Sequence, residues 1–215
     1  MFRTEILMPQ SKFNPHSGVW SPGAQPQADQ PTLHLHTQDD PLRGRIESYI
    51  HQRYLRRYGA RLKHWMPNLV CLQSNGEILA AAGYRDALTP LFLERYLSAP
   101  VEHYLRDDDL PVARSQIVEA GQFAAMRPGA GRLLVPMLAR HLQERGFAWA
   151  VSTLTDELHH LFSRMGLAYQ PLAEATAQSL DNADRKDWGN YYEHHPQVFA
   201  GKLSSILSRH SEHEA

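Results

Sequence analysis

The sequence predicts an α/β domain in which helices flank a mixed central sheet. Along the chain, segments with apolar residues at every third or fourth position alternate with short segments that have them at every second position. The length fits one such domain, because 215 residues can bury a sizeable core but fall short of two comfortable domains. A composition of 42% hydrophobic and 21% charged residues is typical of a globular protein.

Composition divides the chain into three regions. Residues 1–31 contain five prolines and their few apolar residues have no period, so we expect an extended or disordered arm. Residues 32–203 carry the periodic segments and form the predicted domain. Residues 204–215 are expected to be a flexible tail.

The first half of the domain is predicted to hold, in order, a strand over residues 33–37, a helix over 46–58, a hairpin of strands 68–73 and 77–84, and an amphipathic helix over 91–105. Gly59 ends the first helix, since glycine tolerates the left-handed backbone at a helix C-terminus. The pair Asn75-Gly76 separates the two strands and favours the tight turn of a hairpin.

The second half is predicted to hold a strand over residues 115–125, a helix over 134–142, a strand over 147–153, a helix over 158–165 and a strand over 167–172. Gly146 and Gly166 follow the two helices as stop signals. Pro136 has no amide hydrogen, so we expect it in the first turn of its helix. The alternation of strands and helices indicates a mixed sheet.

Charge and residue content exclude several classes of protein. The 22 basic and 23 acidic residues nearly cancel, whereas a nucleic-acid-binding domain has a basic excess. Cys71, the single cysteine, cannot form an intramolecular disulfide and is expected to be a buried, inert thiol. No stretch has the roughly 20 apolar residues of a membrane helix, so we expect a cytoplasmic protein. The 13 histidines lack the spacing of a zinc hydrolase, and we predict no metal site.

The segment over residues 117–134 carries the strongest chemical signal. A strand runs into a loop with Gly129 and Gly131, and the loop opens an amphipathic helix. A helix N-terminus offers free amide hydrogens and a positive dipole end, and glycines let a phosphate approach the backbone. Arg127 and Arg132 add positive charge, so the segment is a candidate pyrophosphate cradle. The alternative is a simple turn, because neither the dinucleotide fingerprint nor the P-loop motif is complete.

Patches in a fixed order add a family resemblance. They are Arg57-Tyr-Gly-Ala, Leu91-Phe-Leu-Glu-Arg-Tyr-Leu, Ile117-Val-Glu-Ala-Gly, Pro128-Gly-Ala-Gly-Arg and Trp188-Gly-Asn-Tyr-Tyr, followed by Pro196, Val198, Ala200 and Gly201. Together they resemble the family named thermostable hemolysin, over about residues 40–203. The order of strand, glycine loop, helix, strand, helix and strand resembles the cofactor-binding half of the GNAT superfamily, over roughly residues 33–173.

The resemblance implies a GNAT-like fold, similar to that of acyl-homoserine-lactone synthases, which transfer fatty acyl groups. In that fold the strand before the loop splays from its neighbour, and the pantetheine arm of coenzyme A lies in the gap. Met126 stands where the superfamily usually has Gln or Arg, and Phe162 stands where it often has the tyrosine that protonates the leaving thiolate. The family name itself implies lysis of red cells.

Three side chains are candidate catalytic groups. Glu119 would take a proton from an acceptor amine if burial raised its pKa; the alternative is a structural carboxylate bonded to backbone amides. Gln122 would hydrogen-bond the thioester carbonyl or the acceptor. Tyr191 or Tyr192 would replace the acid missing at Phe162, and the alternative is aromatic packing in the core or in a pocket wall.

The expected cofactor-binding residues follow the strand and its loop: Phe123, Ala124, Ala125, Arg127, Gly129, Ala130, Gly131 and Arg132. Backbone amides near the first two of these would contact the pantetheine arm and the oxyanion. The family resemblance also places Arg85 and Glu94 near the acceptor site.

We therefore predict an enzyme, an acyltransferase that moves an acyl group directly from a thioester to a small amine. The donor is coenzyme A or the phosphopantetheine of an acyl-carrier protein, and the resemblance favours a fatty acyl group. An acidic carrier protein would meet basic residues of one segment, or these are simply solvated: Arg43, Arg45, Arg53, Arg56, Arg57, Arg61 and Lys63. The alternatives are a membrane-active lytic protein and a GNAT-like module that binds acyl thioesters without catalysis.

Overall fold

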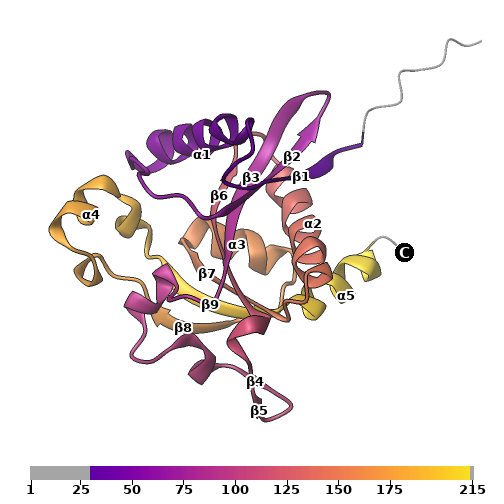
Figure 1. Cartoon of the computed structure of the whole chain (residues 1–215), viewed down its shortest axis with the longest axis vertical. Helices are drawn as coiled ribbons and strands as arrows, with labels where there is room; N and C mark the ends of the chain where they lie inside the picture. The colour runs from indigo at the N-terminus through magenta and orange to yellow at the C-terminus, as the bar shows by residue number, and fades with distance from the viewer. Residues whose placement is uncertain (1–29, 214–215) are drawn as a thin grey trace, which may run out of the picture.

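A seven-stranded mixed sheet runs through the domain in the order β1-β2-β3-β6-β7-β9-β8 (Figure 1). The computed structural model describes residues 30–213, without the side chains of residues 183 and 209–213, so the expected arm lies almost entirely outside it. The strands are β1 (Thr32–His36), β2 (Asn68–Ser74), β3 (Glu77–Asp86), β6 (Ile117–Ala125), β7 (Trp149–Leu154), β8 (Gln170–Glu174) and β9 (Gln197–Lys202). Only β6 and β7 are paired in parallel among these strands; every other neighbouring pair is antiparallel.

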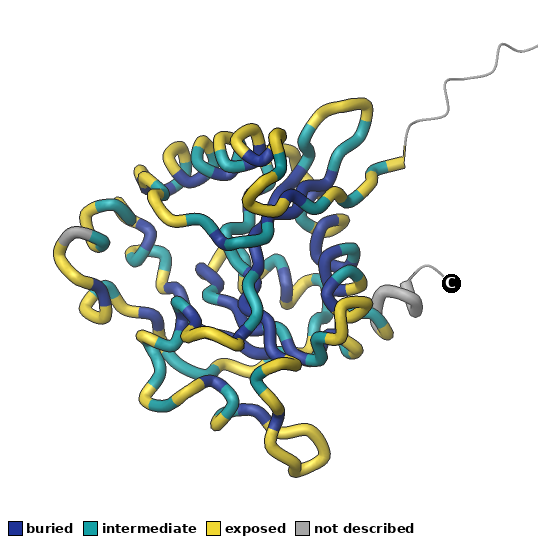
Figure 2. The backbone as a smooth tube through the Cα atoms, in the orientation of Figure 1, coloured by how far each residue is buried: buried dark blue, intermediate teal, exposed yellow. Residues whose placement is uncertain are grey.

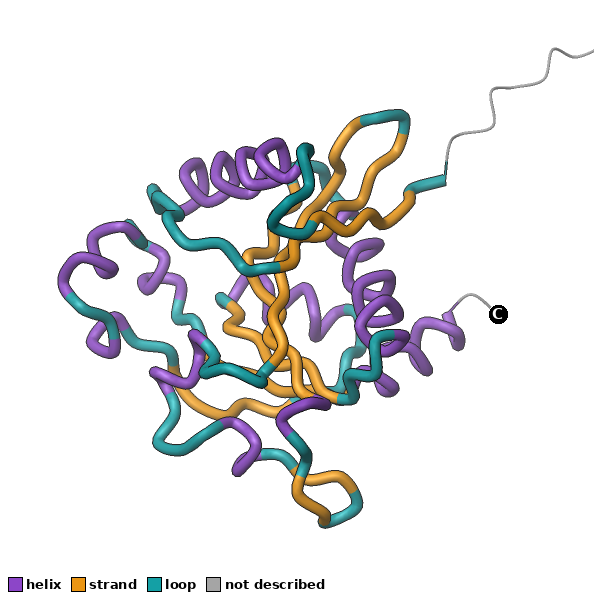
Figure 3. Tube along the Cα trace, viewed as in Figure 1, coloured by secondary structure: helices purple, strands orange, loops and turns teal. Residues whose placement is uncertain are grey.

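Helices cover both faces of this sheet, which confirms the predicted fold class (Figure 3). The α-helices are α1 (Arg43–Tyr58), α2 (Ala130–Glu144), α3 (Asp156–Arg164), α4 (Asn182–Asp187) and α5 (Leu203–His213). Short 3-10 helices are η1 (Phe92–Tyr96), η2 (Val101–Tyr104), η3 (Arg114–Gln116), η4 (Ala177–Ser179) and η5 (Tyr191–His194), and a small hairpin joins β4 (Arg106–Asp107) to β5 (Leu110–Pro111). No helix within residues 30–213 is both long and apolar enough to cross a membrane.

Side-chain alternation along the strands divides the core into two layers. Val70 and Leu72 of β2 pack with α2 and α5, whereas Leu69 and Cys71 pack with α1. This follows from the strand period of two, which sends successive side chains to opposite faces. The outer side of α1 and the β4–β5 hairpin remain exposed, while strands β2, β3, β6, β7 and β9 are largely buried or half-buried (Figure 2).

Cys71 is buried, as expected, and its thiol lies between His36 Nε2 at 3.2 Å and Gln73 Nε2 at 2.9 Å. Burial raises the pKa of this thiol, which keeps it protonated.

The predicted helix over residues 91–105 is wrong. The segment forms η1 and η2, which are separated by Pro100, a residue that can donate no helical hydrogen bond. Glu94 accepts the amide hydrogens of Leu91 and Val101, at 2.8 and 2.9 Å, and thereby fixes both short helices. Apolar spacing alone could not distinguish this folded-back segment from one amphipathic helix.

The C-terminal region and one proline also differ from expectation. Residues 204–213, expected in the flexible tail, continue helix α5, and Ile206 and Leu207 pack against the core cluster that contains Leu203. Strand β9, which the sequence analysis did not assign, pairs with both β7 and β8. Pro136 is the seventh residue of α2 and so lies inside the helix, beyond its first turn.

Arg43 fastens the start of α1 to the sheet. Its guanidinium donates hydrogen bonds to the carbonyl oxygens of Met66 and Pro67, both at 2.8 Å, and of His36 at 3.3 Å. Its Nε lies 2.7 Å from the Glu47 carboxylate. With the residue buried, Arg43 is a structural cation and cannot receive a carrier protein, which corrects one of the expected docking residues.

Substituting Arg43→Met should lower the free energy of unfolding by about 3 kcal/mol, because each buried acceptor left unpaired costs roughly 1–3 kcal/mol. Urea denaturation measures this difference. The matched variant Arg56→Met removes an exposed arginine from the same helix and should stay within about 0.5 kcal/mol of the wild type. Equal stabilities for the two variants would contradict the structural role of Arg43.

Candidate active site

Strand β6 changes the sheet face of its side chains at Gln122. The register passes from Gly83↔Gly121 to Ala81↔Ala124, so one extra residue is inserted on β6. Gln122 has a left-handed backbone with φ 53°, which is uncommon for a residue other than glycine. As a result Ala120 packs with α2 and Ala124 packs with α1, although a regular strand would place both on one face.

The parallel strands β6 and β7 separate soon after they begin. They pair at Ile117↔Trp149, Val118↔Ala150 and Glu119↔Val151, but β6 continues to Ala125 and β7 to Leu154. The expected splay is therefore present. Beyond Glu119 the backbone groups on this side of β6 have no strand partner in β7, which leaves a gap beside the glycine loop.

A groove of about 450 Å³ lies beside this gap. The end of β6, the loop over residues 126–129, the first turn of α2 and helix α3 line it. Five basic residues line the groove against one acidic residue, Glu157. The basic residues are Arg53, Arg127, Arg132, His160 and Arg164. Such a surface suits a polyanion such as a diphosphate. We call it the cofactor groove.

The glycine loop approaches this groove without side chains. Gly129 has φ 82° and open space where a Cβ would stand, and Gly131 has only Leu161 Cδ2 near its Cβ position, at 3.2 Å. Two amides of the first turn are already bonded to the loop: Ala130 donates to the Arg127 carbonyl and Arg132 to the Gly129 carbonyl. The cradle is therefore less open than a helix N-terminus with all its amides free.

Most of the predicted cofactor-binding residues meet in the cofactor groove. Phe123, Ala124, Ala125, Arg127, Gly129, Gly131 and Arg132 line it. Ala130 does not, because its side chain is buried in the core under α2. Arg127 also forms an ion pair with Glu77 that is largely exposed. Arg53, Tyr58 and Arg164, which the sequence analysis did not assign to this site, come from α1 and α3 and join only through the tertiary fold.

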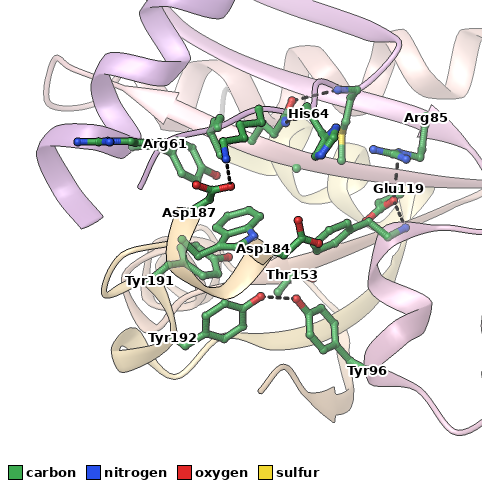
Figure 4. Close-up of a pocket in the computed structure, with 18 of the residues that line it drawn as sticks. Arg61, His64, Arg85, Tyr96, Glu119, Thr153, Asp184, Asp187, Tyr191 and Tyr192 are labelled. Atoms are coloured by element: carbon green, nitrogen blue, oxygen red, sulfur yellow. Dashed lines mark hydrogen bonds and ion pairs between the residues drawn. The ribbon is translucent and has the colours of Figure 1, made fainter. Parts of the chain in front are cut away.

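A second cavity, of about 100 Å³, lies on the α1 side of β6 and is called the acceptor cavity here (Figure 4). Its β6 residues are Glu119 to Gln122, directly before the stretch that lines the cofactor groove. Aromatic side chains from η1, α1 and the segment over residues 188–192 form much of its wall: Tyr54, Phe92, Tyr96, Trp188, Tyr191 and Tyr192. The hydroxyls of Tyr96 and Tyr192 lie 2.5 Å apart across it.

Glu119 lies at the acceptor cavity and is only 3% exposed. Its carboxylate accepts the amide hydrogens of Phe92 at 3.1 Å and Leu93 at 3.2 Å, which ties η1 to the sheet. Arg85 Nε is 3.3 Å from Oε2. Burial raises the pKa of Glu119, and the charge of Arg85 and the two amides oppose that rise. The residue thus has the bonds of a structural carboxylate and the position of a proton acceptor.

Gln122 fastens the loop over residues 61–67 to β6. Its Oε1 accepts the Met66 amide hydrogen at 3.3 Å, and its Nε2 donates to the His64 carbonyl at 2.9 Å. A Cβ at Gly83 would stand 2.9 Å from this Oε1 and from Met66 Cβ, so glycine is required there. Both polar ends of Gln122 are therefore occupied by the protein itself.

Tyr191 belongs to an aromatic cluster. It is 6% exposed, and its ring contacts Tyr58 at 5.1 Å, Trp188 at 4.9 Å and Tyr54 at 6.3 Å between centroids. Burial raises the pKa of its hydroxyl well above the usual value. Phe162 packs edge-on against Phe123 at 5.8 Å in the cofactor groove and offers no hydroxyl there.

Arg85 and Glu94, both expected near the acceptor, are separated. Arg85 lines the acceptor cavity. Glu94 instead bonds Arg114 Nη1 at 2.6 Å, and Arg114 also reaches Glu102. Burial alone would raise the pKa of Glu94. The hydrogen bonds from Arg114 and from the amides of Val101 and Leu91 outweigh this effect and lower the pKa to about 2. Glu94 is thus part of a half-buried structural network.

Two arginines of α1, and Lys63 in the loop that follows it, are engaged in ion pairs as well. Arg53 and Arg57 pair with Glu157 of α3, at 3.4 and 2.9 Å, and Lys63 pairs with Asp187 at 2.6 Å. These contacts join α1 to the walls of the two cavities.

Comparison with known proteins identifies the fold. A family model described as thermostable hemolysin matches residues 36–207. The sequence has no match among curated proteins. Similar solved structures include TofI in an apo form, with 15% identity, a TM-score of 0.55 and coverage of 83% of this chain and 95% of TofI. The CoA-dependent acyl-homoserine lactone synthase MesI has 16% identity and a TM-score of 0.52, and the match covers 85% of this chain and 94% of MesI. FeeM, an N-acyl amino acid synthase from uncultured soil microbes, has 12% identity and a TM-score of 0.56, and the match covers 84% of this chain and 95% of FeeM. The GNAT-like fold expected from the sequence is therefore confirmed.

The raised pKa of Glu119 makes a prediction for stability against pH. The Glu119 carboxyl has a pKa of about 4.3 in the unfolded chain and a higher pKa in the folded protein. At pH values between these two, it is ionised in the unfolded chain and still protonated in the folded protein. The Glu119 contribution to stability is therefore full below that window and is lost as pH rises through it. The stability of Glu119→Gln minus that of the wild type should rise across the window and then level off, as measured by urea denaturation at a series of pH values. A difference that falls with pH would contradict the assigned direction.

Proposed function

We propose that this chain, which belongs to the thermostable hemolysin family, is an acyltransferase that moves an acyl group from a thioester to a small amine. The observation that carries the proposal is the continuity of two cavities along one strand. Glu119 to Gln122 line the acceptor cavity, and Phe123 to Ala125 line the cofactor groove. A thioester held in the groove would present its carbonyl carbon at the open gap between β6 and β7.

The residues of the cofactor groove fit a pantetheine diphosphate. Arg132 and Arg164 would neutralise the diphosphate, and the glycines at 129 and 131 would let it approach the backbone. The unpaired edge of β6 would hydrogen-bond the extended pantetheine arm as a strand partner would. Such binding would supply the activated acyl carbon for transfer.

In the transfer step the acceptor amine attacks the thioester carbonyl, a C–N bond forms and the C–S bond breaks. Glu119 accepts the proton that the amine loses, and a raised pKa makes its carboxylate a stronger base. Backbone amides at the gap stabilise the developing oxyanion. The leaving thiolate then needs a proton.

Tyr58 is the proton donor that we favour for this thiolate. Phe162 cannot donate, and Tyr191 lines the acceptor cavity and not the groove. Tyr58, at the end of α1, lines the cofactor groove, and its hydroxyl is 3.5 Å from Thr155 Oγ1. Burial raises the pKa of the Tyr58 hydroxyl, and the hydrogen bond with Thr155 only partly lowers it again. The hydroxyl therefore carries a proton at neutral pH.

The donor and the biological outcome belong to the proposal. A fatty acyl group is favoured because FeeM is an N-acyl amino acid synthase and MesI an acyl-homoserine lactone synthase. Either coenzyme A or a carrier protein would deliver the same phosphopantetheine arm to the groove. Lysis of red cells would then be indirect, through a surface-active acylated product. We place the enzyme in the cytoplasm, where acyl thioesters are made.

Binding of coenzyme A tests the proposal first. At about 100 times its dissociation constant, coenzyme A should add about 2.7 kcal/mol to the free energy of unfolding. The charge reversal Arg132→Glu should abolish this gain, because Arg132 lines the cofactor groove, whereas Arg56→Glu on the outer side of α1 should preserve it. Lysis of liposomes by the wild type without any thioester, together with no stabilisation by coenzyme A, would favour the membrane-active alternative.

Thiol release from acyl-CoA in the presence of amines tests the proton donor. Tyr58→Phe should lower kcat roughly 100-fold with little change in KM, because general acid catalysis typically contributes about 100-fold or more. Tyr191→Phe removes a neighbouring hydroxyl and should retain near-wild-type kcat. A larger loss of kcat in Tyr191→Phe than in Tyr58→Phe would identify Tyr191 as the proton donor. Stable binding of coenzyme A without turnover in any variant would favour the non-catalytic module.

A further inference from the structure

Two residues that line the acceptor cavity each carry a buried polar atom without a hydrogen-bond partner. Within the described part of the chain, four buried side-chain nitrogen or oxygen atoms have no hydrogen-bond partner: Arg85 Nε, Trp149 Nε1, Thr153 Oγ1 and His194 Nε2. Two of these atoms belong to Arg85 and Thr153, residues that line the acceptor cavity. Buried polar groups without partners are costly, and their presence at one cavity indicates a ligand that supplies the missing partners.

Arg85 is a cation whose donors remain available. Its Nε is within ion-pair distance of Glu119, at 3.3 Å, but the geometry is not that of a hydrogen bond. Glu119 is already engaged by the amides of Phe92 and Leu93. The buried Arg85 Nε has no hydrogen-bond partner, and the Arg85 side chain is only 27% exposed. Figure 4 shows it at the cavity beside Glu119.

We propose that the acceptor is an amino acid whose carboxylate is held by Arg85. The inference rests on the proposed acyl transfer and names the substrate class of that site. A planar guanidinium binds a carboxylate through two parallel hydrogen bonds, which fixes the orientation of the molecule as well as its position. The other cations of the cavity suit this role less well, since Lys63 is paired with Asp187 at 2.6 Å and Arg61 is exposed.

The position of Thr153 orients the amine. Thr153 lies on β7 two residues beyond Val151, the last residue that pairs with β6, and so borders the open gap. Its unpartnered hydroxyl would accept a hydrogen from the amine of an acceptor that Arg85 holds by the carboxylate. The amine would then lie at the gap, where the thioester carbonyl is proposed to stand.

The remaining wall selects the side chain of the amino acid. Phe92 and Trp188 lie 6.0 Å apart between ring centroids, and Tyr96 and Tyr192 close the cavity beside them. Their rings offer apolar faces to an aromatic or large aliphatic side chain. Phenylalanine and leucine are therefore the first acceptors to test, and acidic amino acids should be poor ones.

Steady-state acyl transfer from octanoyl-CoA and palmitoyl-CoA tests this inference. The acceptors are phenylalanine, its methyl ester and phenethylamine, which share the ring and the amine and differ in the carboxylate. The wild type should favour phenylalanine by about 10- to 150-fold in kcat/KM, the range expected for losing a hydrogen bond to a charged group. Arg85→Met should remove this preference, chiefly through KM, so that the ratio of kcat/KM for phenylalanine to that for phenethylamine falls to about one, whatever the change in absolute rate from the loss of the Arg85 charge beside Glu119. Arg85→Lys should restore part of the preference, and Arg56→Met should change nothing.

Stabilisation of each variant by coenzyme A separates this inference from the proposed function. Arg85→Met should still be stabilised like the wild type, which also shows that it is folded. The inference is overturned if the wild type uses phenethylamine as well as phenylalanine, or if Arg85→Met slows all three acceptors equally. If coenzyme A does not bind the wild type, or no amine is acylated, the proposed function fails together with it.

Discussion

The change of face at Gln122 is the constraint on which both cavities depend. One extra residue in β6 lets Glu119 and Gly121 face α1, while Phe123 and Ala125 pack toward α2. A regular strand would have directed all four to the same side of the sheet. The left-handed φ of 53° at Gln122 costs energy, and the two hydrogen bonds of its side chain to residues 64 and 66 help to hold it.

The rest of the site is arranged around this irregular strand. Met66 packs over Gly83 and Gly121, where a Cβ would stand 2.9 and 3.0 Å from its atoms. Asp187 accepts the Arg61 amide hydrogen at 2.7 Å, and Tyr58 accepts that of Asn190 at 2.9 Å. The aromatic wall is thus tied to the end of α1, and α1 in turn is tied to the sheet by Arg43. The acceptor cavity therefore depends on backbone contacts between segments far apart in the sequence.

Local patterns predicted the elements that local rules determine. The strand over residues 115–125, the loop and the helix after it follow from apolar period and glycine placement, and so does the resulting set of groove residues. The bulge could not be predicted, because Gln122 is no glycine and only its tertiary partners hold its conformation. Strand β9 has a short apolar run that needs β7 and β8 to be recognised. Arg43 resembled its solvated neighbours on α1, and only the fold buries it.

The proposed acyl transfer requires that the unpaired side of β6 receive the pantetheine arm of the donor. Hydrogen–deuterium exchange of peptides that cover residues 119–133, measured with and without saturating coenzyme A, tests this directly. We expect slower exchange in these peptides on binding, because open backbone amides acquire partners, and no change in peptides from β1 and β2. Stabilisation of the protein by coenzyme A with unchanged exchange over residues 119–133 would show that coenzyme A binds elsewhere and would contradict binding along β6.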